Sequence, residues 1–423
     1  MRSWFRAIEL WLPRGPSVVA VLLLTALVAC GNPELALPPT TPTAPPEASP
    51  APGQATYKVG LLASLTGPYA TRGISAQNAV RLAAQQVNAS GGVGGHTIEL
   101  LVEDDRGDAS QAVIALKNVV NADAVAIIGP TTNIAAAAVV PLLDEANVPA
   151  ISLAPDQSQF QPVHRFVYVV APPATLLAAG LLSYLEQSQI RNIALIRETS
   201  AYGTAGMNDL QAQAGKFGVR LITDEPYGIN DTDMSRQIKN VKNNPLVEAL
   251  VVWASTGSGA AAVIIHQLHE LGLTVPVLLT IDQADPSFLQ AAGSSADGAI
   301  LEAGKPAIFK YLAPTDASRQ PIDAFTTAYR QATGKEPDHY AAMAYDAFQI
   351  VVAALRSVGP GPDQLVAELE KTSVNGVAGP YVFSPTEHAG MQPSAIAMAA
   401  VRSGEFVPIH PNCQGCAETT TVK

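Results

Sequence analysis

The stretch that decides the fold is AVAIIGPTTNIAAAAVVPLLDEANVPAISL, residues 124–153. Its two ends, residues 124–129 and 148–153, are short runs of β-branched and other apolar side chains, which is typical of buried strands. Between them, residues 132–146 have apolar side chains at helical spacing. Two buried strands joined by a helix predict a parallel strand pair with a helical crossover.

The same alternation recurs along the chain. Further strand-like runs lie at 57–64, 97–103, 192–197, 219–223, 249–253 and 275–280. Further helical stretches lie at 74–89, 109–121, 203–216 and 259–271. Strand, helix and strand repeated this often predict an α/β fold built on mostly parallel sheets.

Two proline-containing segments, near residues 158–173 and 305–321, interrupt the alternation, and a fresh series begins at about Thr175. Two doubly wound, Rossmann-like lobes joined by a hinge that the chain crosses more than once explain both interruptions. The predicted boundaries are 57–170 plus 305–372 for the N-terminal lobe, 171–304 plus 373–408 for the C-terminal lobe, and 409–423 for a tail.

Composition limits the possible functions. The 423 residues are 48% hydrophobic, which is too apolar for a disordered chain. With 25 basic and 36 acidic residues the net charge is -11, which argues against a nucleic-acid partner. The three cysteines are Cys30, Cys413 and Cys416, so neither a disulfide framework, a cysteine zinc site nor a catalytic cysteine is expected in the body of the fold.

The N-terminal residues form an export signal. Three arginines precede an apolar run at residues 18–29, and Cys30 follows it. A permanent membrane helix is the alternative, but the run is shorter than the about 20 residues that a span needs. Residues 27–30, LVAC, resemble a bacterial lipobox, which predicts removal of the signal peptide at 1–29 and a lipid on Cys30 rather than a free thiol.

Low-complexity sequence follows the signal. Residues 31–56 contain eight prolines, a composition that favours an extended chain over a packed core. Residues 30–56 therefore read as a tether that holds the folded domain off a membrane. At the other end, Cys413 and Cys416 lie in a polar tail, where a local disulfide is favoured over a redox or metal pair.

Candidate ligand-binding residues follow the predicted strands, because open parallel sheets bind ligands beyond the carboxyl ends of their strands. The first lobe offers Tyr69 and Arg72 after the first strand, Thr131, Thr132 and Asn133 after the third, and Ala154, Pro155 and Asp156 after the fourth. The second lobe offers Tyr202, Trp253 and Asp282. The expected ligand is therefore a small polar molecule in a crevice between the lobes.

Each candidate has a structural alternative. Residues 131–133 open a helix whose free N–H groups favour a carboxylate, but the same residue types cap helices in general. Asp156 and Asp282 are acids suited to an ammonium group, or are N-caps. Tyr202 and Trp253 form a flat wall for a ligand, or pack in the core.

Signals for catalysis or cofactor binding are weak. The sequence contains no GxGxxG, GxxxxGK[ST] or GxSxG pattern, and HQLHE at residues 266–270 lacks the HExxH order of zinc proteases. Neither an enzyme, a cofactor nor a metal site is predicted. An exported hydrolase is kept only as a distant alternative.

Several long segments together resemble the branched-chain amino-acid-binding proteins of ABC importers. The resemblance runs through GLLASLTGPYATRGISAQNAVRLAAQQVNASGGVGG at residues 60–95, ELLVEDDRGDASQAV, IIGPTTNIAAAAVVPLLDEANVPAIS, ETSAYGTAG and AFTTAYRQATGKEPDHYAAMAYDAF, and it spans about residues 57–408. It implies the type I periplasmic-binding-protein fold, in which two lobes joined by three crossings close on a ligand.

The resemblance also implies roles for individual residues. In that family a Ser or Thr after the third strand binds the ligand carboxylate, which points to residues 131–133. The tyrosine of the family's YGxG turn corresponds to Tyr202, and an acid near Asp282 completes the ammonium site. Pro155 and Asp156 stand where Ala and Thr are usual, and Arg72 stands where an aromatic residue is frequent. These departures leave the ligand's side chain open among branched-chain amino acids, amides, urea and aromatic acids.

The function predicted from these observations is that of a lipid-anchored, extracytoplasmic solute-binding protein of an ABC transporter. It captures an amino acid, branched-chain or related, and delivers it to a membrane permease. The resemblance implies a monomer. The alternative of another class is a sensory module that presents the same kind of ligand to a receptor.

Overall fold

The computed structural model describes residues 55–255 and 259–409. The predicted signal peptide, Cys30, nearly all of the predicted tether and the pair Cys413 and Cys416 lie outside the described residues, so the predictions about them remain predictions.

The first sheet has five parallel strands in the order β2-β1-β3-β4-β5. Because β1 pairs with both β2 and β3, the strand order reverses direction at β1, and the loops after β1 and β3 face one crevice. The strands are β1 (Thr56–Ala63), β2 (Thr97–Asp104), β3 (Ala126–Ile128), β4 (Ala150–Ser152) and β5 (Val167–Val169).

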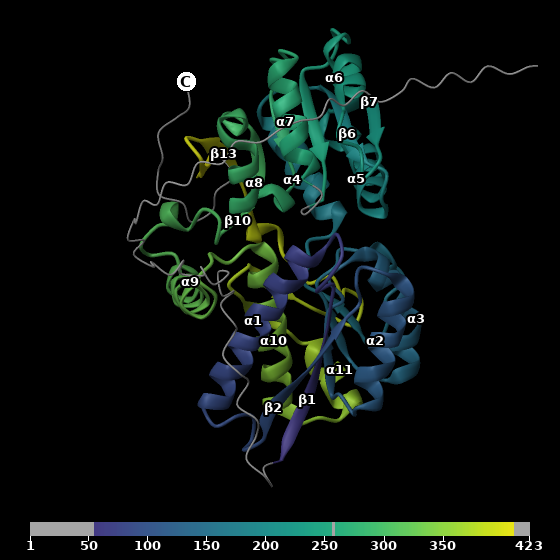
Figure 1. Ribbon diagram of the computed structural model, residues 1–423, viewed down its shortest axis with the longest axis vertical. Helices are drawn as coiled ribbons and strands as arrows, with labels where there is room; N and C mark the ends of the chain where they lie inside the picture. Colours follow the sequence, from purple (N-terminus) through teal and green to yellow (C-terminus); the bar gives the residue numbers. More distant parts are fainter. Residues whose placement is uncertain (1–54, 256–258, 410–423) are drawn as a thin grey trace, which may run out of the picture. The chain divides into compact units, whose positions relative to one another are not determined.

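Helices cover both faces of this sheet. Leu61 and Ala63 pack in the core shared with α1 and α10, whereas Leu62 between them packs in a separate core with α2 and α3, as the period-two geometry of a strand requires. Figure 1 shows α1 beside α10 and α2 beside α3. The helices are α1 (Ala70–Ala89), α2 (Ala109–Asn121), α3 (Asn133–Ala146) and α10 (His339–Val358).

The second sheet repeats this order. Its strands follow β7-β6-β8-β9-β10, the same pattern as in the first sheet, and antiparallel β13 and β14 extend it beyond β10. The strands are β6 (Asn192–Glu198), β7 (Arg220–Tyr227), β8 (Ala249–Trp253), β9 (Val277–Leu279), β10 (Ile300–Gly304), β13 (Ile396–Arg402) and β14 (Glu405–Pro408). Its helices are α4 (Ala174–Gln187), α5 (Ala201–Ala214), α6 (Ser235–Lys242), α7 (Ala260–Glu270) and α8 (Pro286–Ala292). The prediction of two doubly wound lobes is confirmed.

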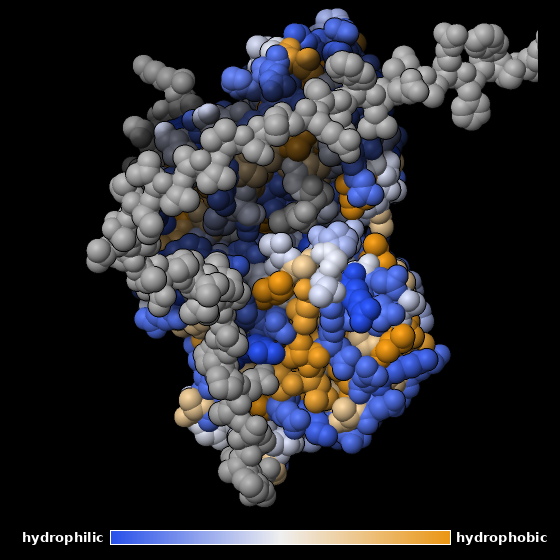
Figure 2. Space-filling model, viewed as in Figure 1, coloured by the Kyte–Doolittle hydropathy of each residue, from blue (hydrophilic) through white to orange (hydrophobic). Residues whose placement is uncertain are grey.

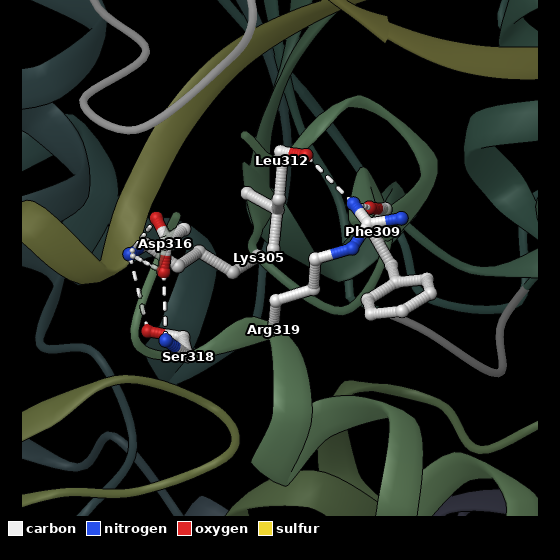
Figure 3. Close-up of polar contacts among 6 residues, drawn as sticks. All are labelled: Lys305, Phe309, Leu312, Asp316, Ser318 and Arg319. Carbon is white, nitrogen blue, oxygen red and sulfur yellow. Dashed lines mark hydrogen bonds and ion pairs between the residues drawn. The ribbon is translucent and has the colours of Figure 1, made fainter. Parts of the chain in front are cut away.

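The chain passes between the lobes three times. It leaves the first sheet after β5, returns after β10 to build α9 (Arg319–Thr333), α10 and α11 (Pro362–Leu369), and re-enters the second sheet at β13. Polar contacts fix the second passage: Lys305 Nζ donates to Asp316 Oδ2 at 2.9 Å, and an Arg319 guanidinium nitrogen donates to the carbonyl of Leu312 at 2.6 Å (Figure 3).

One predicted boundary differs from the structure. The segment after residue 372, which includes the small hairpin β11 (Ser373–Asn375) and β12 (Pro380–Val382), was assigned to the C-terminal lobe. It packs on the first lobe instead, because Asp346 in α10 accepts hydrogen bonds from Val377 N at 2.7 Å and Ala378 N at 2.8 Å, and Val169 N donates to the carbonyl of His388 at 2.8 Å. The chain re-enters the second sheet only at β13.

Strands β5 and β10 are among those not predicted from the sequence. β5 is only three residues long and lies inside the proline-interrupted segment, and β10 contains Glu302 and Gly304, which strands usually disfavour. β10 lies between β9 and β13 and four of its five residues are buried, so burial rather than residue preference selects this strand.

Among the described helices, α10 has the length and apolar composition of a membrane span, but two thirds of that window is buried inside the protein. It is the core helix that packs along α1. Figure 2 shows hydrophilic residues over much of the visible described surface, with hydrophobic residues in smaller groups.

Candidate functional site

Two equivalent turns from a strand into the next helix position the candidate site, and each is called a corner below. One corner joins β1 to α1 in the first lobe, and the other joins β6 to α5 in the second. In the first lobe a Cβ on Gly73 of α1 would lie 2.0 Å from the carbonyl oxygen of Ser64, just after β1. In the second lobe a Cβ on Gly203 of α5 would lie 2.0 Å from the carbonyl oxygen of Glu198, the last residue of β6. Only glycine lets each helix begin this close to its strand. The residue before each glycine, Arg72 or Tyr202, lines the pocket described below.

Acidic side chains at the end of β2 hold the first corner. Asp104 accepts hydrogen bonds from Leu65 N at 2.8 Å and Thr66 Oγ1 at 2.6 Å, and Asp105 accepts one from Ser64 Oγ at 2.5 Å. Burial acts to raise the pKa of Asp104, but the hydrogen bonds outweigh it and hold this pKa below its ordinary value. These acids therefore fix the loop that leads to α1.

The pocket lies between loops of the two lobes. It is lined by Tyr69, Arg72, Thr132, Asn133, Ile134, Pro155, Glu198, Ser200, Ala201, Tyr202, Ser255, Asp282 and Tyr340. It encloses about 60 Å³, whereas sites for drug-sized ligands typically span roughly 300 to 1,000 Å³. As it stands, the pocket has room only for a very small molecule.

Asp282 is held by tyrosines from both lobes. The hydroxyl of Tyr202 in α5 donates to one carboxylate oxygen of Asp282, and the hydroxyl of Tyr340 in α10 donates to the other at 2.6 Å. Burial, followed by the negative charge of Asp282, raises the pKa of Tyr202 well above its ordinary value, so this phenol stays a hydrogen-bond donor.

A second acid, Glu198, faces the same pocket and is 1% exposed. Its carboxylate accepts hydrogen bonds from Ser255 N at 2.8 Å and Ser255 Oγ at 2.9 Å, and also from the hydroxyl of Ser200. These three donors hold the Glu198 carboxylate in place beside the pocket.

Arg72 supplies a positive charge to the pocket. Its guanidinium lies over the ring of Tyr340 at 4.7 Å and within 5.3 Å of the ring of Tyr69, and the residue is 8% exposed. Burial alone would lower the pKa of Arg72, but electrostatic interactions with Tyr340, Asp282 and Glu198 outweigh it and raise this pKa. Arg72 therefore fills the space between two aromatic rings and remains charged.

Seven of the eleven predicted ligand-binding residues line this pocket: Tyr69, Arg72, Thr132, Asn133, Pro155, Tyr202 and Asp282. Thr132 also caps α3 by accepting a hydrogen bond from Ala135 N at 3.4 Å, which confirms the capping interpretation, while its contact with a ligand stays a prediction. Asn133 is the first residue of that helix.

The other four predicted residues do not line it, each for a local reason. Thr131 is buried and accepts a hydrogen bond from Ser64 N at 3.1 Å, which ties the β1 and β3 loops together. The Ala154 carbonyl accepts from Gln159 Nε2 at 2.6 Å. Asp156 caps a short 3-10 helix by accepting from Ser158 N at 3.0 Å. Trp253 is fully buried behind Tyr202, with ring centroids 5.7 Å apart.

Sequence reasoning missed Ile134, Glu198, Ser200, Ala201, Ser255 and Tyr340. Glu198 was not predicted because the expected strand ends at residue 197, whereas β6 ends at Glu198. Ser200 and Ser255 lie in loops at strand ends, but no further signal distinguishes them from their neighbours. Tyr340 had no local signal, since it begins a helix that reaches the site only through the second passage between the lobes.

Two other cavities, each about 440 Å³, contain none of the predicted site residues. Within residues 55–255 and 259–409, no three His, Cys, Asp or Glu side chains are grouped so that they could hold a metal ion. The pocket between the corners thus combines two carboxylates, one guanidinium, phenols and hydroxyls, an arrangement suited to binding a small charged molecule.

Comparison with known proteins places these features in context. A family model described as periplasmic binding protein matches residues 56–405. Leu/Ile/Val-binding protein homolog 7 of Brucella abortus (strain 2308) is 23% identical over 389 residues, 88% of this chain and 96% of that protein. An amino acid binding protein of Pseudomonas aeruginosa is 24% identical over 325 residues, 74% of this chain and 82% of that protein.

Solved structures have the same fold. An extracellular ligand-binding receptor from Rhodopseudomonas palustris HaA2 matches with a TM-score of 0.76 and 24% identity, covering 84% of this chain and 99% of that one. The branched-chain amino acid transporter substrate binding protein LivJ of Streptococcus pneumoniae, solved in complex with isoleucine, matches with a TM-score of 0.72 and 22% identity, covering 84% of this chain and 100% of that one.

Proposed function

The chain belongs to the periplasmic binding protein family, and we propose that it captures a small amino acid outside the cytoplasm and passes it to the permease of an ABC transporter. The proposed role is binding and delivery without chemical conversion of the ligand. The observation that carries it is the Asp282 carboxylate, which faces the pocket and is held by hydroxyls from both lobes.

The charges in the pocket match a zwitterion. Asp282 and Glu198 provide two carboxylates for an ammonium group, which would be costly to bury without an anionic partner. In the same pocket, Arg72 and the start of α3 at Thr132 and Asn133 favour a carboxylate. The names of the relatives, Leu/Ile/Val-binding and amino acid binding proteins, support the same ligand class.

Binding requires a rearrangement. About 60 Å³ does not accommodate a branched side chain, and Arg72 occupies the space between Tyr69 and Tyr340. We therefore propose that the ligand enters as Arg72 swings toward its carboxylate, or as the lobes hinge apart and close again. Amides, urea and aromatic acids are the alternative ligands. They lack an ammonium group, so their binding would not require pairing with Asp282 and Glu198.

The proposed location depends on the first thirty residues. We propose that the signal peptide is removed before Cys30 and that a lipid on this cysteine tethers the domain to a membrane. A Cys30→Ala variant should then appear in the soluble fraction after cell lysis. If the variant stays with the membranes, the lipid anchor is refuted, whereas the ligand-binding proposal stands.

Ligand binding is tested by a thermal-shift screen with leucine, isoleucine, valine, urea, acetamide and 4-hydroxybenzoate, since ligand at 100 times its Kd stabilises by about 2.7 kcal/mol. Leucine or another amino acid should raise Tm, and Asp282→Asn should weaken that binding about 50-fold, because it removes one of the two carboxylates proposed to pair with the buried ammonium. Asp297→Asn, an exposed change in the same lobe, is the control.

The amino-acid assignment fails if only urea, acetamide or the aromatic acid raises Tm. The site assignment fails if Asp282→Asn binds the amino acid as tightly as the wild type does while circular dichroism shows it folded.

A further inference from the structure

A second cavity, of about 440 Å³, lies within the second lobe and shares no lining residue with the Asp282 pocket. Its wall comprises α4, β10, the start of β13 and the first residues of the passage after β10. Most of the wall is apolar or small, and its volume falls in the range of small-molecule sites. The residues that matter for the argument are Leu176, Gly180, Phe217, Glu302, Ile308 and Met398.

Glu302 is the unusual member of this wall. It is 0% exposed, and neither of its carboxyl oxygens has a hydrogen-bond partner among the described residues. Leaving a buried polar group unsatisfied costs roughly 1 to 3 kcal/mol, so such groups generally have a partner. Glu302 lines the cavity, and an unsatisfied carboxyl buried in its wall is what a site without its ligand would contain.

Gly180 in α4 leaves the room for this carboxyl. A Cβ at this position would lie 2.6 Å from Glu302 Oε1, so any other residue would crowd the carboxyl group. Helix interiors normally disfavour glycine, by about 1 kcal/mol relative to alanine. Helix α4 is therefore intrinsically less stable with glycine at position 180 than it would be with alanine, at the point where it packs against Glu302.

The other charged residue of the wall does not neutralise Glu302. Lys305 Nζ donates to Asp316 Oδ2 at 2.9 Å and to Ser318 Oγ at 3.2 Å, and Figure 3 shows its side chain directed at these two groups. Burial, followed by the charge of Asp282, raises the pKa of Glu302 well above its ordinary value, while the nearby Ile281 N–H acts in the opposite direction without meeting hydrogen-bond geometry. A cation from outside would reverse this effect.

We propose that this cavity is a second binding site, for a small organic cation that carries a primary ammonium group on an apolar body. The ammonium pairs with Glu302, and the apolar body lies against Leu176, Phe217, Ile308 and Met398. The proposal can be tested separately from the amino-acid pocket, because the two cavities share no lining residue.

The test is calorimetric titration of the purified full-length protein with butylammonium and, for comparison, with 1-butanol, a neutral molecule of similar size. Butylammonium should bind at millimolar concentration or tighter and at least tenfold more tightly than 1-butanol. Glu302→Gln keeps the shape but removes the charge, and should weaken butylammonium binding at least tenfold. Glu186→Gln, an exposed change on the same helix α4, should leave it unchanged.

A second variant guards against misfolding of Glu302→Gln. Ser394 is exposed and lines the same cavity, so Ser394→Trp should obstruct it without entering the core, and should also weaken binding. Equal affinity of the wild type and a folded Glu302→Gln, equal affinity for the amine and the alcohol, or no butylammonium binding to the wild type would each overturn the proposal.

Discussion

The two corners that form the pocket have one geometry but different chemistry. In each lobe a glycine of the helix touches the carbonyl at the end of the preceding strand, at 2.0 Å from the position of an added Cβ. In each, the residue before that glycine lines the pocket: a cation, Arg72, in the first lobe and a phenol, Tyr202, in the second. The repeated fold thus determines which positions line the pocket, and the residue at each position determines whether a ligand contacts a guanidinium or a phenol.

The glycines give the strongest test of this equivalence. Gly73→Ala and Gly203→Ala should each lower the free energy of unfolding by about 3 kcal/mol, because the new methyl group meets backbone that has little room to shift. The midpoint of urea unfolding measures both. Gly215→Ala is the matched control, since its backbone is helical and nothing lies within 4 Å of the added Cβ, so it should stabilise by at most about 1 kcal/mol. The equivalence is broken if only one of the two corner variants is destabilised.

The side chains give the finer test. Arg72→Met should weaken amino-acid binding about tenfold, because it removes the positive charge from the pocket while keeping an apolar side chain between the two rings. Tyr202→Phe should weaken it about fivefold, because it removes one of two hydroxyl donors that hold Asp282. Titration of both variants with the amino acid found in the screen gives the comparison. If the order of the two losses is reversed, the second lobe supplies more of the binding energy than proposed.

The residues also show how far sequence reasoning reaches. Strands that are regular apolar runs, such as β1 and β8, were predicted almost to the residue, because burial on both faces imposes a continuous apolar pattern. Seven of the eleven candidate residues line one pocket for a similar reason, since strand ends in a parallel sheet share one edge.

The remaining differences arise where a residue's contacts cannot be read from its neighbours in the sequence. Asp156 stands in the expected loop but accepts a hydrogen bond from Ser158 N two residues on, a local contact that competes with a ligand. Thr131 accepts one from Ser64 N, 67 positions away, which no local pattern indicates. Tyr340 contacts Asp282 across 58 positions of chain, which no local pattern indicates. The hairpin after residue 372 was misassigned because it is held by Asp346, again far away in the sequence.

Trp253 lost its proposed role as a wall, but its position has a practical use. The chain contains three tryptophans, and the other two, Trp4 and Trp11, belong to the predicted signal peptide. The processed protein would then carry a single indole, fully buried and 5.7 Å from the ring of Tyr202. The fluorescence emission of Trp253 therefore offers a signal, without any added label, for changes in the pocket that Tyr202 lines.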